Sequence, residues 1–246
     1  MKTVTSLLII LFCTSAIYAD EILVAAASDL QFALPKIATA FEKKTQHRVK
    51  FSFASSGNLF AQINNGAPFD LFFSADTDYP RKLAPLAGPL HLYARGQIVL
   101  WTRKDSGIDV SKGFDALLQA KKVAIANPEH APYGKAALAA LQHAKIYEKV
   151  RSKLVLGENI SQTAGFIESG AAQIGIISLA LASESRVASL GRYWNVPLDA
   201  YPVMNQAAVL LKASPHSKIA ETFLSFVTGP TAQKVLKQSG FLPPSW

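Results

Sequence analysis

Short, continuously apolar segments alternate along this chain with amphipathic helical patterns. Between the first two apolar segments, Leu34, Ile37, Ala38 and Phe41 recur at helical spacing. The apolar segments cover residues 22–26, 49–53, 71–74, 98–102, 123–126, 154–156, 174–178 and 207–211. Such alternation is typical of α/β proteins, and strands that are apolar throughout indicate sheets covered on both faces. The sequence therefore predicts an α/β fold of mostly parallel sheets covered by helices.

Residues 1–19 have the pattern of a cleaved secretory signal peptide. Lys2 precedes an apolar run at residues 7–12, and Ala19 is a small residue at the expected cleavage site. The apolar run is too short for a bilayer, which needs about 20 residues. Cys13 is the only cysteine, and the bulky residue before it disfavours lipid attachment. We therefore expect a protein exported to the periplasm, with no cysteine in its mature chain.

The chain is basic, with 25 Lys and Arg against 17 Asp and Glu and a formal net charge of +8. The positive residues are scattered, mostly over predicted helix faces, and no basic run is interleaved with aromatic residues. This pattern gives little support to nucleic-acid binding and fits a solvated basic surface with a mild attraction for anions.

The sequence carries no recognisable catalytic or cofactor motif. It lacks a Gly-x-Ser-x-Gly elbow, a His-Glu-x-x-His pair and a phosphate-binding loop, and its 5 histidines are dispersed. We therefore expect a binding protein without a cofactor or a metal-ion site, and not an enzyme.

Three strand-to-helix junctions instead end in small residues with hydrogen-bond donors. Ser28 and Asp29 follow the first strand, Ser55-Ser56-Gly57 follows the second, and Tyr133 stands before a glycine at a third helix start. A helix N-terminus leaves backbone N–H groups unpaired and favours anions. We expect Ser28 to be an N-cap, Asp29 to contribute its backbone N–H, and Gly57 to allow close approach of another group.

Several of these segments resemble the periplasmic molybdate-binding proteins of ATP-binding cassette importers. The matching segments are VAAAS (24–28), FASSGNL (53–59), GAPFDLFFSAD (66–76), NPEHAPYG (127–134) and the tail from FVTGP (226–230) to SGF (239–241). The resemblance covers essentially the whole mature chain. It implies a two-lobed type II periplasmic-binding-protein fold, with residues 20–94 and 205–246 in lobe I and 95–204 in lobe II.

The resemblance also implies a set of ligand-binding residues between the lobes. The binding serines of the family fall on Ser28 and Ser56, with Asp29 also lining the anion, and a backbone N–H falls on Ile160. One branch of the family has a late tyrosine where this chain has Ser178. The other branch takes its phenol from the segment that here contains Tyr133, so we expect Tyr133 to be the tyrosine donor.

The implied function is capture of molybdate, with tungstate as a second ligand, by neutral donors and delivery to an inner-membrane permease. These dianions carry no proton near neutral pH, so a site made only of donors suits them. Sulfate and phosphate stay open as alternative ligands, as does an enzyme on the same two-lobed scaffold. We expect a monomer.

Overall fold

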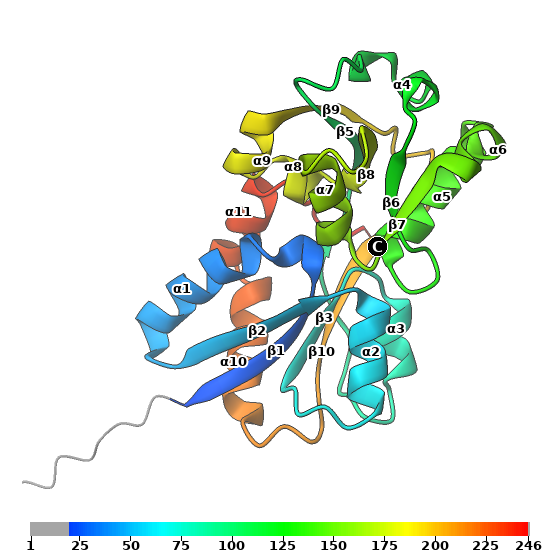
Figure 1. Ribbon diagram of the computed structural model, residues 1–246. Coiled ribbons are helices and arrows are strands. Elements are labelled where there is room, and N and C mark those ends of the chain that lie inside the picture. The colour runs from blue at the N-terminus through cyan, green and yellow to red at the C-terminus, as the bar shows by residue number, and fades with distance from the viewer. Residues whose placement is uncertain (1–19, 246) are drawn as a thin grey trace, which may run out of the picture.

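The computed structural model describes residues 20–245 and contains two five-stranded sheets (Figure 1). We call the parts built around them lobe I and lobe II. The sheet of lobe I has the order β2-β1-β3-β10-β4, and its strands are β1 (Glu21–Ala27), β2 (Arg48–Ala54), β3 (Leu71–Ser74), β4 (His91–Arg95) and β10 (Asn205–Leu210). The sheet of lobe II has the order β7-β6-β8-β5-β9, and its strands are β5 (Ile98–Arg103), β6 (Val123–Ala126), β7 (Leu154–Gly157), β8 (Ile174–Ser178) and β9 (Gly191–Asn195).

The two-lobed α/β fold predicted from the sequence is confirmed, but both sheets are mixed rather than mostly parallel. In lobe I, β1 runs parallel to β2 and β3, whereas β10 runs antiparallel to β3 and β4. In lobe II, β6 is parallel to β7 and β8, and β5 is antiparallel to β8 and β9. The antiparallel pairs arise where a strand enters its sheet from the other lobe, because it starts at the edge where the parallel strands end.

Helices cover both faces of the lobe I sheet, as the continuous apolar strands predict. Helices α1 and α10 pack on one face, around Phe41, Phe73 and Phe223, while α2 and α3 pack on the other. The helices of this lobe are α1 (Ala33–Thr45), α2 (Ser56–Asn64), α3 (Asp78–Lys82), α10 (Ser217–Thr228) and α11 (Pro230–Gln238), preceded by the 3-10 turn η1 (Ser28–Leu30).

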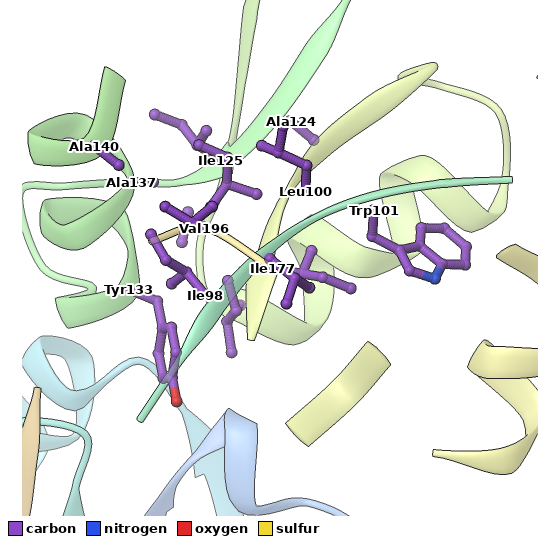
Figure 2. Close-up of a cluster of buried hydrophobic side chains, with 14 of the residues drawn as sticks. Ile98, Leu100, Trp101, Ala124, Ile125, Tyr133, Ala137, Ala140, Ile177 and Val196 are labelled. Carbon is purple, nitrogen blue, oxygen red and sulfur yellow. The ribbon is translucent and has the colours of Figure 1, made fainter. Parts of the chain in front are cut away.

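Lobe II has one continuous apolar core, in which Trp101 is fully buried (Figure 2). Its helices are α4 (Asp115–Gln119), α5 (Pro132–His143), α6 (Tyr147–Val150), α7 (Ile160–Glu168), α8 (Leu179–Ala182) and α9 (Ser185–Leu190), with 3-10 turns η2 (Val110–Lys112) and η3 (Arg151–Lys153). Tyr133 belongs to this core by its ring, but its hydroxyl is directed away from the core, towards the blue and cyan segments of lobe I (Figure 2).

The chain passes between the lobes twice, after β4 and before β10. The two crossings lie side by side, because the Gly96 N–H donates to the carbonyl oxygen of Met204 at 2.9 Å. The proposed boundary 204/205 falls at the end of the second crossing, whereas 94/95 falls inside β4, one residue before that strand ends.

No helix among residues 20–245 is long and apolar enough to cross a membrane. The predicted signal peptide, residues 1–19, lies outside the described residues.

Candidate functional site

A small pocket lies where the starts of several helices meet between the lobes. We call it the interlobe pocket. It is lined by Ala27, Ser28, Asp29, Ala54, Ser55, Ser56, Ala75, Ala131, Pro132, Tyr133 and Ile160. All five residues proposed as a site from the sequence are in this lining, although they come from four separate segments of the chain.

At the start of α2, the neighbouring residues Ser55 and Ser56 have different roles. Ser55 is the N-cap, and its Oγ accepts a hydrogen bond from the Asn58 N–H at 3.2 Å. The Oγ of the fully buried Ser56 accepts from the Ala75 N–H at 2.9 Å. A hydroxyl that accepts in this way still has its own hydrogen to donate. Ser56 can therefore serve an anion in the pocket.

The expectation that Ser28 caps a helix is wrong. Helix α1 begins only at Ala33, and the turn η1 that starts at Ser28 has Ala27 as its N-cap. The Ser28 hydroxyl instead reaches lobe II, donating to Asn159 Oδ1 at 3.2 Å and accepting from the Ser161 N–H at 3.4 Å. Ser28 is thus a contact between the lobes, because the start of α7 lies opposite the end of β1.

The carboxylate of Asp29 is the centre of a buried hydrogen-bond network. Its Oδ2 accepts from the Tyr133 hydroxyl at 2.9 Å and from Gln206 Nε2 at 2.8 Å. Gln206 Oε1 in turn accepts from the Tyr93 hydroxyl at 2.9 Å. The sequence analysis assigned only the backbone N–H of Asp29 to the site and missed Gln206. Gln206 stands directly before the apolar residues of β10, after Asn205, and this position at the start of a strand is the signal that could have found it.

Burial changes the protonation of this network. Desolvation raises the pKa of Asp29 to about 6, against the opposing effect of the hydrogen bonds from Gln206 and Tyr133 and of the backbone N–H groups of Asp29 and Leu30. Desolvation, followed by the nearby Asp29 charge, raises the pKa values of Tyr93 and Tyr133 well above the ordinary value for tyrosine. Both phenols therefore stay neutral, and Asp29 is the member of the network that can change charge.

Helices α5 and α7 present their N-termini to the interlobe pocket from lobe II. Pro132 and Tyr133 are the first residues of α5. Ile160 is the first residue of α7, after the N-cap Asn159, whose Oδ1 accepts from the Gln162 N–H at 3.0 Å. The first N–H groups of a helix have no partner within it, so Ile160 offers a backbone donor to an anion.

Two further contacts hold the lobes together beside the pocket. The Gly57 N–H donates to the His130 carbonyl oxygen at 2.9 Å, and Ser55 Oγ lies 3.0 Å from His130 Nδ1. A Cβ on Gly57 would lie 2.6 Å from that carbonyl oxygen, so only glycine allows this approach. The sequence analysis predicted close approach at this glycine but did not predict its partner, His130.

Ser178 does not line the interlobe pocket. It is the N-cap of α8, and its Oγ accepts from the Leu181 N–H at 3.2 Å.

No Lys, Arg or His side chain is among the residues that line the interlobe pocket. A wider cleft of about 600 Å³ shares Ala75 and Pro132 with it and is also lined by Arg81 and Lys135. Within residues 20–245, no group of three His, Cys, Asp or Glu side chains is arranged to hold a metal ion. The pocket therefore offers an anion hydroxyl groups and helix N-termini, without a cationic side chain.

Residues 22–242 match the model of the family described as bacterial extracellular solute-binding protein. The chain belongs to that family. It is 36% identical over 230 residues to the molybdate-binding protein ModA of Azotobacter vinelandii, covering 92% of this chain and 91% of that protein. It is 35% identical to the molybdate-binding protein ModA of Rhodobacter capsulatus, covering 91% of this chain and 89% of that protein.

A solved structure leads to the same group. The periplasmic molybdate-binding protein of Azotobacter vinelandii superposes with a TM-score of 0.85 and 34% identity, over 91% of this chain and 100% of that one. Within the solute-binding proteins, the chain therefore belongs with the molybdate-binding proteins.

Proposed function

We propose that this protein captures molybdate, and tungstate as well, in the interlobe pocket and delivers it to the permease of an ATP-binding cassette importer. The observation that carries the proposal is the pocket itself, in which the starts of α2, α5 and α7 meet without any cationic side chain. Helix N-termini and neutral donors stabilise an anion that has no hydrogen to give back. Relatives named as molybdate-binding proteins support this choice of anion.

Within the proposed site, Ser56 and the Ile160 N–H supply hydrogen bonds from the two lobes, and Ser28 can donate to the anion once its hydroxyl turns away from Asn159 Oδ1. Tyr133 closes the pocket from α5, but its hydroxyl donates to Asp29 Oδ2 in the structure. We therefore propose that Tyr133 serves the anion through Asp29, and not by a direct bond as the sequence suggested.

The proposal places the mature chain in the periplasm, after removal of residues 1–19, as a monomeric receptor that needs no cofactor. It assigns no chemical step to the interlobe pocket.

Titration calorimetry of ligand-stripped protein tests the proposal. Molybdate, tungstate, sulfate and phosphate are titrated at one pH and one salt concentration. We expect one molybdate or tungstate per chain, bound at least about 100-fold more tightly than sulfate or phosphate, since a closed pocket discriminates by size and by protonation. Equal or tighter binding of sulfate or phosphate would assign the protein to another oxyanion, and turnover of an added ester would indicate an enzyme.

A further inference from the structure

One carboxylate oxygen beside the interlobe pocket lacks a hydrogen-bond partner. Asp29 is 1% exposed, and its Oδ2 accepts from both Tyr133 and Gln206. Its Oδ1 is also buried and accepts no hydrogen bond of ordinary geometry from the described residues, although the backbone N–H groups of Asp29 and Leu30 lie close enough to the carboxylate to favour its charged form. Buried polar atoms are nearly always paired, so an unpaired one at a ligand pocket indicates a group that the ligand completes.

An ionised Asp29 and a dianion are incompatible in this pocket. The lining of the pocket contains no Lys, Arg or His to offset the negative charges of the Asp29 carboxylate and of the bound dianion. Repulsion between like charges is strong where water is excluded, and it favours the neutral form of a carboxyl group. One proton on Asp29 Oδ1 removes the repulsion and turns an acceptor into a donor.

We propose that Asp29 binds the oxyanion as a carboxylic acid, so that each dianion captured brings one proton from solvent into the interlobe pocket. The Oδ1–H then donates to an anion oxygen, while Tyr133 and Gln206 hold Oδ2 and fix the orientation of the acid. The carboxylate gains one proton and loses its charge, and no other bond changes. The inference rests on the proposed function, because it requires a dianionic ligand at this site.

Few other groups near the interlobe pocket could take up the proton in place of Asp29. The elements packed around the pocket carry Tyr93 on β4, Tyr133 on α5, Asp76 after β3, His130 before α5, Glu158 before α7 and Lys36 on α1. Both phenols stay neutral, and Lys36 pairs with Glu184 at 2.9 Å outside the pocket. The oxygen Oδ1 of Asp76 is already occupied by Ser74 Oγ at 2.9 Å and by the Tyr79 N–H at 3.1 Å. His130 and Glu158 face each other across 3.4 Å, outside the lining of the pocket.

The proposal predicts how affinity depends on pH. The pKa of Asp29 is about 6 in the ligand-free protein, and a bound dianion raises it further. Below pH 6 the acid is already present, so affinity is constant there. Above it, affinity falls by up to tenfold per pH unit, which makes molybdate binding about 50-fold weaker at pH 8 than at pH 6.

The test is calorimetry of the full mature chain with molybdate at pH 8, in buffers of different ionisation enthalpy, repeated from pH 5.5 to pH 8.5. The slope of observed enthalpy against buffer enthalpy counts the protons taken up. We expect about one proton per molybdate in the parent protein at pH 8. Asp29→Asn, which keeps the shape and replaces the acid by an amide donor, should take up none. It should also bind molybdate more tightly than the parent protein at pH 8.

Two control variants separate Asp29 from its neighbours. Asp76→Asn and His130→Gln should both keep the uptake of one proton, whatever their affinities, with thermal denaturation confirming that each variant folds. Molybdate binding by the parent protein without proton uptake would overturn the inference and leave the proposed function intact. Phosphate binding more tightly than molybdate, without proton uptake, would overturn both, because Asp29 would then accept a proton carried by the ligand.

Discussion

At the residue scale, Tyr133 connects the apolar core of lobe II to the site. Its ring is buried in that core (Figure 2), while its hydroxyl donates to Asp29 Oδ2 at 2.9 Å. We expect Tyr133→Phe to lower molybdate affinity by about 10–150-fold, because a hydrogen bond to a charged or strongly polar group contributes about 1.5–3 kcal/mol. The matched control is Ser178→Ala, which removes the cap of α8 and should cost about 1 kcal/mol of folding stability with little change in affinity. Calorimetry of both variants at pH 6 measures their molybdate affinities relative to the parent protein. The reverse order of effects would show that Ser178 is the residue at the site.

Asp29 also links the stability of the ligand-free protein to pH. Its pKa is about 6 in the folded chain and 3.8 as an exposed group, so the folded protein holds the proton more tightly than the unfolded chain does. The resulting stabilisation is complete below pH 3.8 and is lost as pH rises through 6. At about 1.4 kcal/mol per pKa unit, the loss is roughly 2–3 kcal/mol. Between pH 4 and pH 8 the free energy of unfolding of the parent protein should therefore fall by this amount. Asp29→Asn has no carboxyl group at this position and should not show this fall. Urea denaturation at both pH values measures it, and an equal effect of the substitution at both would contradict the assigned pKa.

Sequence reasoning at this scale found residues but not their partners. Ser28, Asp29, Ser56, Tyr133 and Ile160 follow strand ends or helix starts, which local patterns reveal. Their partners Asn159, Ser161 and Gln206 are brought to the pocket only by the folding of distant segments. No local pattern reports that Gln206 lies beside Asp29, or that the Ser28 hydroxyl is taken by α7 and not by its own helix.

At the scale of elements, the predicted strands were those with a mostly apolar run, including β2, where Lys50 and Ser52 interrupt the run. The missed strands are β4, whose first residues are partly exposed, and β9, which is largely exposed and lies at the edge of its sheet. Such strands have no continuous apolar run to reveal them. The antiparallel direction of β10 could not be predicted either, since it depends on where the chain returns from lobe II.

The start of α2 is the element that sets how closely the lobes approach. Because a Cβ on Gly57 would lie 2.6 Å from both the His130 carbonyl oxygen and the Tyr79 hydroxyl, Gly57→Ala should push the lobes apart at this point. The lost hydrogen bond and the overpacking together should cost about 1.5–3 kcal/mol of the closed state, or about 10–150-fold in molybdate affinity. Gly165→Ala, on an open face of α7 with no atom within 4 Å, is the matched control and should bind like the parent protein. Parent-like affinity in Gly57→Ala would show that this contact does not limit closure.

At the scale of the whole molecule, several of the contacts that join the two lobes lie at or beside the interlobe pocket. Ser28 with Asn159, Gly57 with His130 and Asp29 with Tyr133 each join one lobe to the other. The Lys36–Glu184 ion pair adds an exposed contact, which contributes little by itself. An anion in the pocket would hold both lobes at once, so capture and closure are one event in this account.

The central claim, that the anion lies between the lobes without a cationic side chain, is tested most directly by a crystal structure of the molybdate complex. The anomalous signal of molybdenum locates the anion independently of the protein model. We expect one peak in the interlobe pocket, within hydrogen-bonding range of Ser28, Ser56 and the Ile160 N–H. A peak in the wider cleft beside Arg81 or Lys135, or any Lys or Arg side chain bonded to the anion, would contradict it.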